Sequence, residues 1–299
     1  MENTIFFGNG LNRLVRSNIG WSDLLDKIKA GNIFADDKLP NTMIYERIVL
    51  QKLNKFDDIL KDEFEVKSEI AKLLEEIEGH EIYQELYASD AQHYITTNYD
   101  YGFLDSILDM PEINKPIFEY STEDVYSIRR RKRISNTKEA KKNFWQIHGE
   151  IRKPATIMLG LDQYCGSIGK LNEYIKGSYK FQEGGNNIVE EAMEDKLRTN
   201  NLTNSSWVEL FFTTNLHIMG FTFDFSEVDL WWLLNRRARM KKSPRTMGLV
   251  NNTVNYYCHE IEAQKQALFE SLLVKVHILP LNKSSDRYIE HYRTIIKSM

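Results

Sequence analysis

His93-Tyr94-Ile95-Thr96-Thr97-Asn98-Tyr99-Asp100 is the stretch of this 299-residue chain that decides its fold. Residues 94–97 form a short β-branched and aromatic run, which predicts a buried strand. Polar side chains follow at once in Asn98, Tyr99 and Asp100. Ligands bind at the carboxyl ends of strands in open α/β sheets. The stretch therefore predicts either a ligand-binding rim or a strand followed by an Asx-type helix cap.

A second strand with a polar end is predicted near the amino terminus. Residues 4–7 are apolar and are followed by Gly8-Asn9-Gly10-Leu11-Asn12-Arg13. A strand, a glycine turn and a helix let backbone N–H groups approach a pyrophosphate. The third glycine of the full dinucleotide fingerprint is absent, because Arg13 occupies its position. A tight turn without a ligand therefore remains an alternative.

Two later segments extend this pattern. Residues 144–150 predict a strand that ends in His148-Gly149, where the near-neutral pKa of an imidazole suits proton transfer. Residues 215–219 predict a strand that ends in Gly220-Phe221-Thr222. Ser226 to Asp229 then form a capping-box pattern that opens the next helix. A glycine turn with a hydroxyl beside a helix start suits a phosphate or ribose contact.

The rest of the chain alternates between helical and strand patterns. Leucine and isoleucine at three- and four-residue spacing predict a helical insertion over about 21–90. Residues 160–205 predict a second small module, and further strands are expected at 155–159, 253–257 and 274–279. The alternation predicts an α/β fold with a doubly wound parallel sheet, in one domain over residues 1–299.

Composition narrows the range of functions. The chain is 42% hydrophobic with six prolines, an ordinary globular composition. No run approaches the ~18 apolar residues of a membrane span. The start of the chain lacks the pattern of a signal peptide. Two cysteines, Cys165 and Cys258, cannot form a four-cysteine zinc site. We therefore expect a cytoplasmic protein without a membrane partner.

One short segment is strongly basic. Arg129-Arg130-Arg131-Lys132-Arg133 lies within a polar, strand-poor section at 111–142. Such a run could contact phosphates. The net charge of the chain is -4, so we expect a solvated hairpin or an oligomer contact rather than nucleic-acid binding.

Taken together, the four strand ends resemble the sirtuin family, and specifically its bacterial sirtuin-like antiphage branch. Gly8-Asn9-Gly10 is similar to the family's Gly-Ala-Gly turn, and Thr97-Asn98-Tyr99-Asp100 to its Gln-Asn-Ile-Asp motif. His148-Gly149 resembles the catalytic His-Gly pair, and Gly220-Phe221-Thr222 resembles the Gly-Thr-Ser loop. The four motifs occur in the family's order and span nearly the whole chain. They imply a Rossmann-like sirtuin fold.

The resemblance also implies that NAD lies across the rim of the sheet as a substrate, with no metal. Asn98 would position the nicotinamide ribose and a water, and His148 would act on a ribose hydroxyl or on that water. Gly8 and Gly10 would approach the diphosphate, Asp100 the nicotinamide carboxamide, and Thr222 a phosphate or ribose. Residues 258–260 would meet the adenosine half. The full set of implied cofactor-binding residues is Gly8, Asn9, Gly10, Asn12, Thr97, Tyr99, Asp100, Gly220, Phe221 and Thr222.

These residue types suit cleavage of the nicotinamide–ribose bond. The leaving group departs neutral from a cationic ring and needs no proton. Fixed dipoles that stabilise an oxocarbenium-like sugar, and a base for the nucleophile's proton, lower the barrier. Asn98 supplies an amide, His148 an imidazole, and Tyr99 and Trp145 an aromatic wall.

Two features of sirtuin deacylases are missing from the sequence. The four-cysteine zinc module is absent, because the interval between His148 and Gly220 holds only Cys165. Asn18-Ile19-Gly20-Trp21 stands where a Pro-Asp-Phe-Arg segment is expected. In this respect the chain resembles the NAD-hydrolysing members of bacterial defence systems.

The resemblance therefore implies an NAD glycohydrolase that depletes NAD in an infected cell. A zinc-free deacylase or ADP-ribosyl transferase, and a non-catalytic module that binds NAD or ADP-ribose, remain alternatives. An always-active hydrolase would poison its host. We therefore expect control by homo-oligomerisation or by a partner defence protein, such as an ATPase or a nucleic-acid-handling protein.

Overall fold

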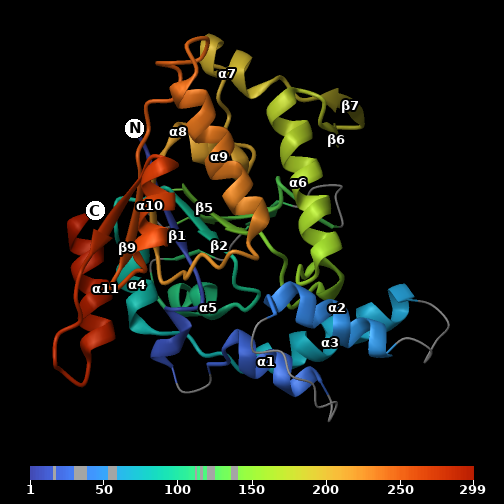
Figure 1. Ribbon diagram of the computed structural model, residues 1–299, viewed down its shortest axis with the longest axis vertical. Helices are drawn as coiled ribbons and strands as arrows, with labels where there is room; N and C mark the ends of the chain where they lie inside the picture. Colours follow the sequence, from blue (N-terminus) through green and yellow to red (C-terminus); the bar gives the residue numbers. More distant parts are fainter. Residues whose placement is uncertain are drawn as a thin grey trace.

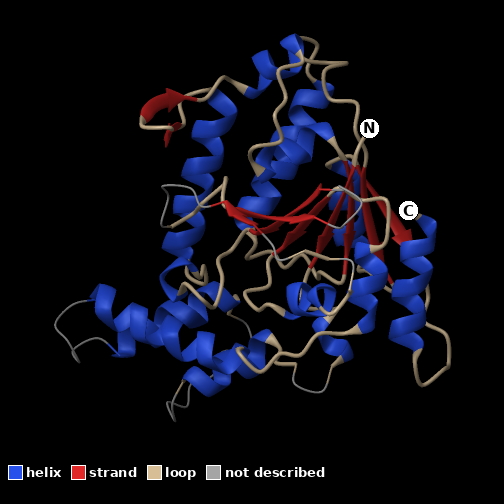
Figure 2. Ribbon diagram, turned by 180° about the vertical axis from the view of Figure 1, so that it is seen from behind, coloured by secondary structure: helices blue, strands red, loops and turns tan. Residues whose placement is uncertain are grey.

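A mostly parallel sheet of eight strands forms the centre of the protein (Figure 2). The structure is a computed structural model that describes residues 1–15, 18–29, 39–52, 59–111, 113–114, 117–119, 125–135 and 141–299. The strands lie in the order β10 (Val274–Ile278), β9 (Val254–Cys258), β8 (Asn215–Met219), β1 (Asn3–Phe7), β2 (His93–Thr96), β5 (Lys141–Gln146), β4 (Arg131–Ser135) and β3 (Ile117–Glu119). Pairing is parallel from β10 to β5 and antiparallel for β4 and β3. The predicted α/β, Rossmann-like fold is confirmed.

Helices cover both faces of this sheet. Ile5 and Phe7 of β1 pack into one hydrophobic core and Phe6 packs into another, as the two-residue period of a strand requires. The first core includes side chains of α4 (Glu81–Tyr87), α5 (Gly102–Leu108) and α11 (Arg287–Ser298). The second includes side chains of α6 (Leu161–Lys176), α8 (Trp207–Thr213), α9 (Val228–Lys242) and α10 (Ala263–Ser271). Burial on both faces explains why the central strands are continuous apolar runs.

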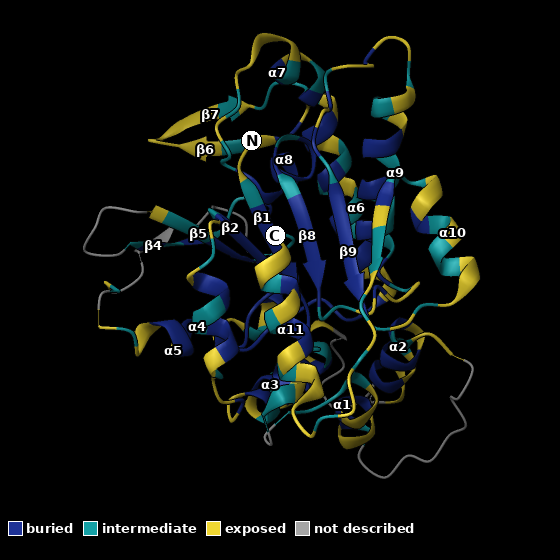
Figure 3. Cartoon of the chain, turned by 90° about the vertical axis from the view of Figure 1, so that its left-hand side faces the viewer, coloured by how far each residue is buried: buried dark blue, intermediate teal, exposed yellow. Residues whose placement is uncertain are grey.

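Three of the four described α-helices between β1 and β2 lie beyond the carboxyl ends of the strands. They are α1 (Trp21–Ile28), α2 (Asn41–Lys52) and α3 (Ile59–Leu74), whereas α4 packs against the sheet. Figures 1 and 3 show them below the sheet, in the direction in which β8 and β9 point. The sequence predicted helices here, although the helix expected over 41–60 falls partly outside the described residues.

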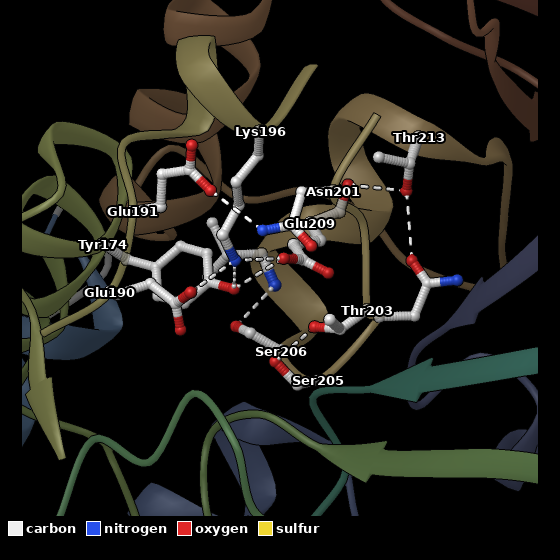
Figure 4. A network of polar contacts seen from close by, with 12 residues as sticks. Tyr174, Glu190, Glu191, Lys196, Asn201, Thr203, Ser205, Ser206, Glu209 and Thr213 are labelled. Carbon is white, nitrogen blue, oxygen red and sulfur yellow. Dashed lines mark hydrogen bonds and ion pairs between the residues drawn. The ribbon is translucent and has the colours of Figure 1, made fainter. Parts of the chain in front are cut away.

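A buried ammonium group links the 160–205 segment to helix α8, which packs on the sheet. It contains α6, the hairpin of β6 (Lys180–Glu183) and β7 (Asn186–Val189), and α7 (Met193–Thr199). Lys196 of α7 donates to Glu209 at 2.5 Å and to the Tyr174 hydroxyl at 3.1 Å, and its Nζ lies 2.6 Å from a Glu190 carboxylate oxygen (Figure 4). This cluster joins α7 to α6 and α8.

Two alternatives were predicted for the basic segment 129–133, and the solvated hairpin is wrong. Its second half lies in β4, and none of its five side chains is exposed. Lys132 is buried and donates to Glu150 at 2.8 Å and to Gln146 Oε1 at 2.6 Å. The Arg129 guanidinium lies 3.5 Å from the centre of the Phe181 ring. The sheet and the 160–205 segment therefore use these cations internally.

Two shorter predictions are also wrong. Residues 155–159 form no strand, because the 3-10 turn η2 (Pro154–Thr156) leads into irregular backbone. After the first glycine turn, the described residues up to Val15 form the 3-10 turn η1 (Asn12–Leu14) instead of a full helix. Among the described residues, no helix is long and apolar enough to cross a membrane.

Candidate active site

A cavity of about 1100 Å³ lies at the carboxyl ends of the central strands. Trp21 of α1, Thr42 of α2 and Leu74 of α3 line its opposite wall. The predicted site residues that line it are Asn9, Gly10, Thr97, Asn98, Tyr99, Asp100, His148, Gly220, Phe221 and Thr222. Gly8 and Asn12 are not among the lining residues. Loops that follow β1, β2, β5 and β8 thus meet at one cavity, and Asn98 shares it with His148.

The glycines of the first turn are required by contact between two loops of the protein. Gly10 N–H donates to the Gly220 carbonyl at 2.7 Å, and Gly8 N–H donates to the Met219 carbonyl at 3.3 Å. A Cβ atom would lie 2.9 Å from the Gly220 oxygen if added to Gly8 and 2.6 Å from it if added to Gly10. Gly220 itself has a φ of 58°, a conformation that favours glycine. The glycines therefore have a packing role, and their contact with a diphosphate stays a prediction.

The loop that carries Asn98 is held by Gln146, for which the sequence predicted no role. Gln146 Nε2 donates to the carbonyl oxygens of Tyr99 at 3.1 Å and Asp100 at 2.8 Å. Asn98 is only 8% exposed, and its Nδ2 has no hydrogen-bond partner among the described residues. An unsatisfied buried amide costs roughly 1–3 kcal/mol. A ligand in the cavity that accepts a hydrogen bond could satisfy it.

Asp100 lines the cavity, but hydrogen bonds within the protein fix its carboxylate. Its Oδ2 accepts from Asn12 Nδ2 at 2.8 Å, and its Oδ1 accepts from Gly102 N–H at 2.9 Å. Burial raises the pKa of Asp100, and these two donors oppose the shift. Asn12 in turn accepts from the Tyr83 hydroxyl at 2.5 Å. Asn12 therefore positions the Asp100 carboxylate and does not itself line the cavity.

His148 follows β5 on a turn that its neighbour Gly149 makes possible. Gly149 has a φ of 102°, and a Cβ atom there would lie 2.2 Å from the Thr156 carbonyl oxygen. The His148 carbonyl accepts a hydrogen bond from Met158 N–H at 2.9 Å. The irregular segment at 154–159 therefore fixes the backbone from which the imidazole projects.

The His148 ring is buried between two carboxylates. Its Nε2 lies 3.1 Å from Asp229 Oδ2, and its Nδ1 lies 3.5 Å from Glu227 Oε2. The predicted capping box at this point is wrong. Helix α9 begins at Val228 without a side-chain cap, and the Ser226 hydroxyl bonds to Asp224 instead. No sequence signal indicated this contact, because Glu227 and Asp229 matched a helix-cap pattern.

The two carboxylates control the protonation of the cluster. Burial lowers the pKa of His148, but the charges of Asp229 and Glu227 outweigh burial and raise it above its usual value. Burial raises the pKa of Glu227 to about 7, although His148 partly offsets this shift. The imidazole therefore keeps its proton to a higher pH than a free histidine does, while Glu227 can exchange its proton near neutral pH.

The same three side chains could be considered for a metal, because their ligand atoms lie within 4.8 Å of one another. Protein donors already engage the oxygens that face the imidazole. The Ser167 hydroxyl donates to Asp229 Oδ2 at 3.0 Å, and the Tyr164 hydroxyl donates to Glu227 Oε2 at 2.9 Å. We therefore interpret the cluster as a hydrogen-bonded acid–base group and assign no metal ligand.

Cationic and aromatic side chains line the rest of the cavity. Arg13 and Lys265 both face it, and Lys265 also donates to the Thr222 carbonyl at 2.6 Å. Residues 258–260 line it as well. Tyr99 forms part of the wall, but Trp145 is fully buried in the second core. The prediction that Trp145 forms part of the aromatic wall is wrong, because its side chain packs in the second core instead of the cavity.

One family model matches part of the chain. Residues 92–205 match the family model of the SIR2-like domain. The matched segment includes Asn98, Asp100 and His148, but not the first glycine turn or the Gly220 loop. No curated protein matches the chain. The match and the mostly parallel sheet support a sirtuin-like family and an NAD-related function.

Proposed function

We propose that the protein hydrolyses NAD at the nicotinamide–ribose bond and releases nicotinamide and ADP-ribose. One observation carries the proposal: Asn98 and His148, both within the SIR2-like segment, line the same cavity. The unpaired Asn98 amide supports it further, because an acceptor on a ribose or a bound water would satisfy that group.

The chemistry requires little beyond positioned dipoles and a base. The C1′–N1 bond breaks, and its electron pair stays on a neutral nicotinamide. The ribose then carries oxocarbenium-like charge until water adds to C1′. The Asn98 amide would hold the ribose and the water, and the acidic groups around His148 would stabilise the positive charge. A wall of α1, α2 and α3 side chains encloses this volume, where electrostatic interactions are stronger than in water.

Incubation of the pure protein with NAD, followed by chromatography of nicotinamide and ADP-ribose, tests the proposal. We expect Asn98→Ala and His148→Ala each to lower nicotinamide release by about 100-fold or more. Circular dichroism should show that both variants remain folded. Asn187→Ala, on the exposed β7, is a control that should keep full activity. Full activity in both site variants would refute the assignment of the site.

The same incubation separates the two alternatives. Turnover that requires an acyl-lysine peptide or a protein acceptor would indicate a zinc-free deacylase or an ADP-ribosyl transferase. Binding of NAD without turnover would indicate a sensing module. Release of nicotinamide in the absence of any acceptor distinguishes the glycohydrolase from both.

We also propose that the activity depletes NAD in an infected bacterial cell and is controlled by homo-oligomerisation or by a partner defence protein. Exposed apolar side chains on α2 and α3, namely Met43, Leu50, Leu60 and Phe64, would suit a protein contact. The basic segment 129–133 does not support this proposal, because its side chains are engaged within the chain. Measuring cellular NAD after phage challenge addresses the first part, and sedimentation addresses the second.

A further inference from the structure

We propose that Glu227, rather than His148, is the general base that takes the proton from the attacking water. His148 is then the positioning residue that orients the Glu227 carboxylate. This inference rests on the proposed NAD hydrolysis, since it assigns a role within that reaction. It follows from the contacts of three side chains that β5, α6 and the start of α9 bring together.

Both ring nitrogens of His148 are already engaged. Asp229, which is fully buried and does not line the cavity, lies 3.1 Å from Nε2. Ser167 donates to the same Asp229 oxygen and fixes it in place. Glu227 faces the other nitrogen at 3.5 Å. Because a carboxylate oxygen lies beside each ring nitrogen, neither nitrogen is free to take a proton from a water in the cavity.

Glu227 has the access that Asp229 lacks. It lines the cavity together with Asn98, His148 and Tyr164. Within the described part of the chain, the polar contacts of its carboxylate with Tyr164 and His148 both involve Oε2. The other oxygen, Oε1, is therefore the one that can turn to a water near Asn98. Two contacts on Oε2 limit the rotation of the carboxylate.

The surroundings of Glu227 suit a base that works near neutral pH. Burial, together with the charges of Asp229 and Asp224, raises the pKa of this carboxyl group to about 7. His148 and the hydrogen bond from Tyr164 oppose the shift. Tyr99 also faces the group, but burial raises its own pKa well above the usual value and keeps it neutral. A base is most effective when its pKa lies near the working pH.

The step conserves atoms and charge. Nicotinamide leaves with the electron pair of the C1′–N1 bond, and a water oxygen forms the new bond to C1′. Glu227 accepts one proton of that water as the bond forms, and the product is ADP-ribose. The proton then passes to solvent, which regenerates the carboxylate. NAD and one water thus give nicotinamide, ADP-ribose and one proton.

Steady-state kinetics of Glu227→Gln test this assignment. The amide keeps the size of the side chain and can still accept from Tyr164, but it cannot take a proton. We expect kcat to fall by about 100-fold or more, with KM for NAD changed by less than about threefold. Wild-type kcat should rise with pH up to about 7 and then level off, because the carboxylate must be ionised. Glu227→Gln should lack this rise.

Chemical rescue distinguishes a base from a structural group. Formate should restore turnover to Glu227→Ala, where it can occupy the vacated space, but not to Glu227→Gln. Glu173→Gln, an exposed position on α6, is the matched control and should behave as wild type.

Three results would overturn the assignment of Glu227 while the proposed function stands. They are a Glu227→Gln kcat within about threefold of wild type, a loss expressed only in KM, or an unchanged pH profile. Absence of nicotinamide release from the wild-type protein would instead overturn the proposed function, and the role of Glu227 with it.

Discussion

At the scale of the residue, Gly149 determines where the imidazole of His148 can lie. Its φ of 102° and the 2.2 Å separation that a Cβ atom would have from the Thr156 oxygen leave no room for a side chain. We expect Gly149→Ala to lower the free energy of unfolding by about 1–3 kcal/mol or more, measured by urea denaturation. Gly169→Ala is the control, because nothing lies within 4 Å of a Cβ at that helical position. Equal stability of both variants would show that the turn relaxes.

Sequence analysis identified the site residues that lie next to a recognisable strand in the sequence. Asn98 and His148 each lie two residues after the end of a strand, and the carboxyl ends of parallel strands meet at one rim. Glu227 and Asp229 fit the pattern of a helix cap, because acidic residues at a helix start usually serve the helix. The contact between Asp229 and His148, for example, joins residues that are 81 positions apart in the sequence. No local pattern encodes such a contact.

At the scale of the element, α7 depends on one buried ammonium group. Replacing Lys196 with alanine would leave the buried Glu209 carboxylate and the neighbouring Glu190 without their cation. Breaking a buried pair in this way costs about 3–5 kcal/mol. We expect Lys196→Ala to lower the thermal unfolding temperature by several degrees or more, measured by calorimetry. Arg198→Ala removes an exposed ion pair from the same helix and should change it little. A result in which both variants melt alike would contradict this role.

The elements that the sequence predicted correctly are those with clear periodicity. The apolar runs that became β1, β2, β8 and β9 are buried on both faces of the sheet and are easy to recognise in the sequence. The strand β4 was missed because four arginines and a lysine are typical of a solvated segment. Lys132 can occupy a buried strand position only because Glu150 and Gln146 supply acceptors from a neighbouring segment. Tertiary contacts therefore overrode the local preference for solvent.

At the scale of the whole molecule, two parts of the chain form the cavity, namely the strand ends and the helical insertion. Sequence analysis identified both but did not predict that they meet. Residues at the strand ends line one side of the cavity, and residues of α1, α2 and α3 line the opposite side. Helical periodicity indicated the insertion but not its position, because an amphipathic helix can pack on any apolar surface. Only the folded chain shows that the insertion covers the rim of the sheet.

This arrangement predicts that a ligand in the cavity stabilises the whole protein and that the insertion contributes to the effect. ADP-ribose, the product that is not turned over, should raise the unfolding temperature. At 100 times its dissociation constant the gain is about 2.7 kcal/mol. Trp21 of α1 lines the cavity, and its ring lies edge-on to Tyr99 at 6.2 Å. Trp21→Ala should weaken ADP-ribose binding by roughly tenfold, which corresponds to about 1.4 kcal/mol.

Trp232→Ala provides the matched control for this experiment. Trp232 lies on α9, packs against the second core and does not line the cavity. Its loss should lower the unfolding temperature of the free protein but leave the shift caused by ADP-ribose intact. An equal ADP-ribose shift in wild type and Trp21→Ala would mean that the ligand contacts only the strand ends. In that case α1 would enclose the site without taking part in binding, and the two parts of the chain would be energetically independent.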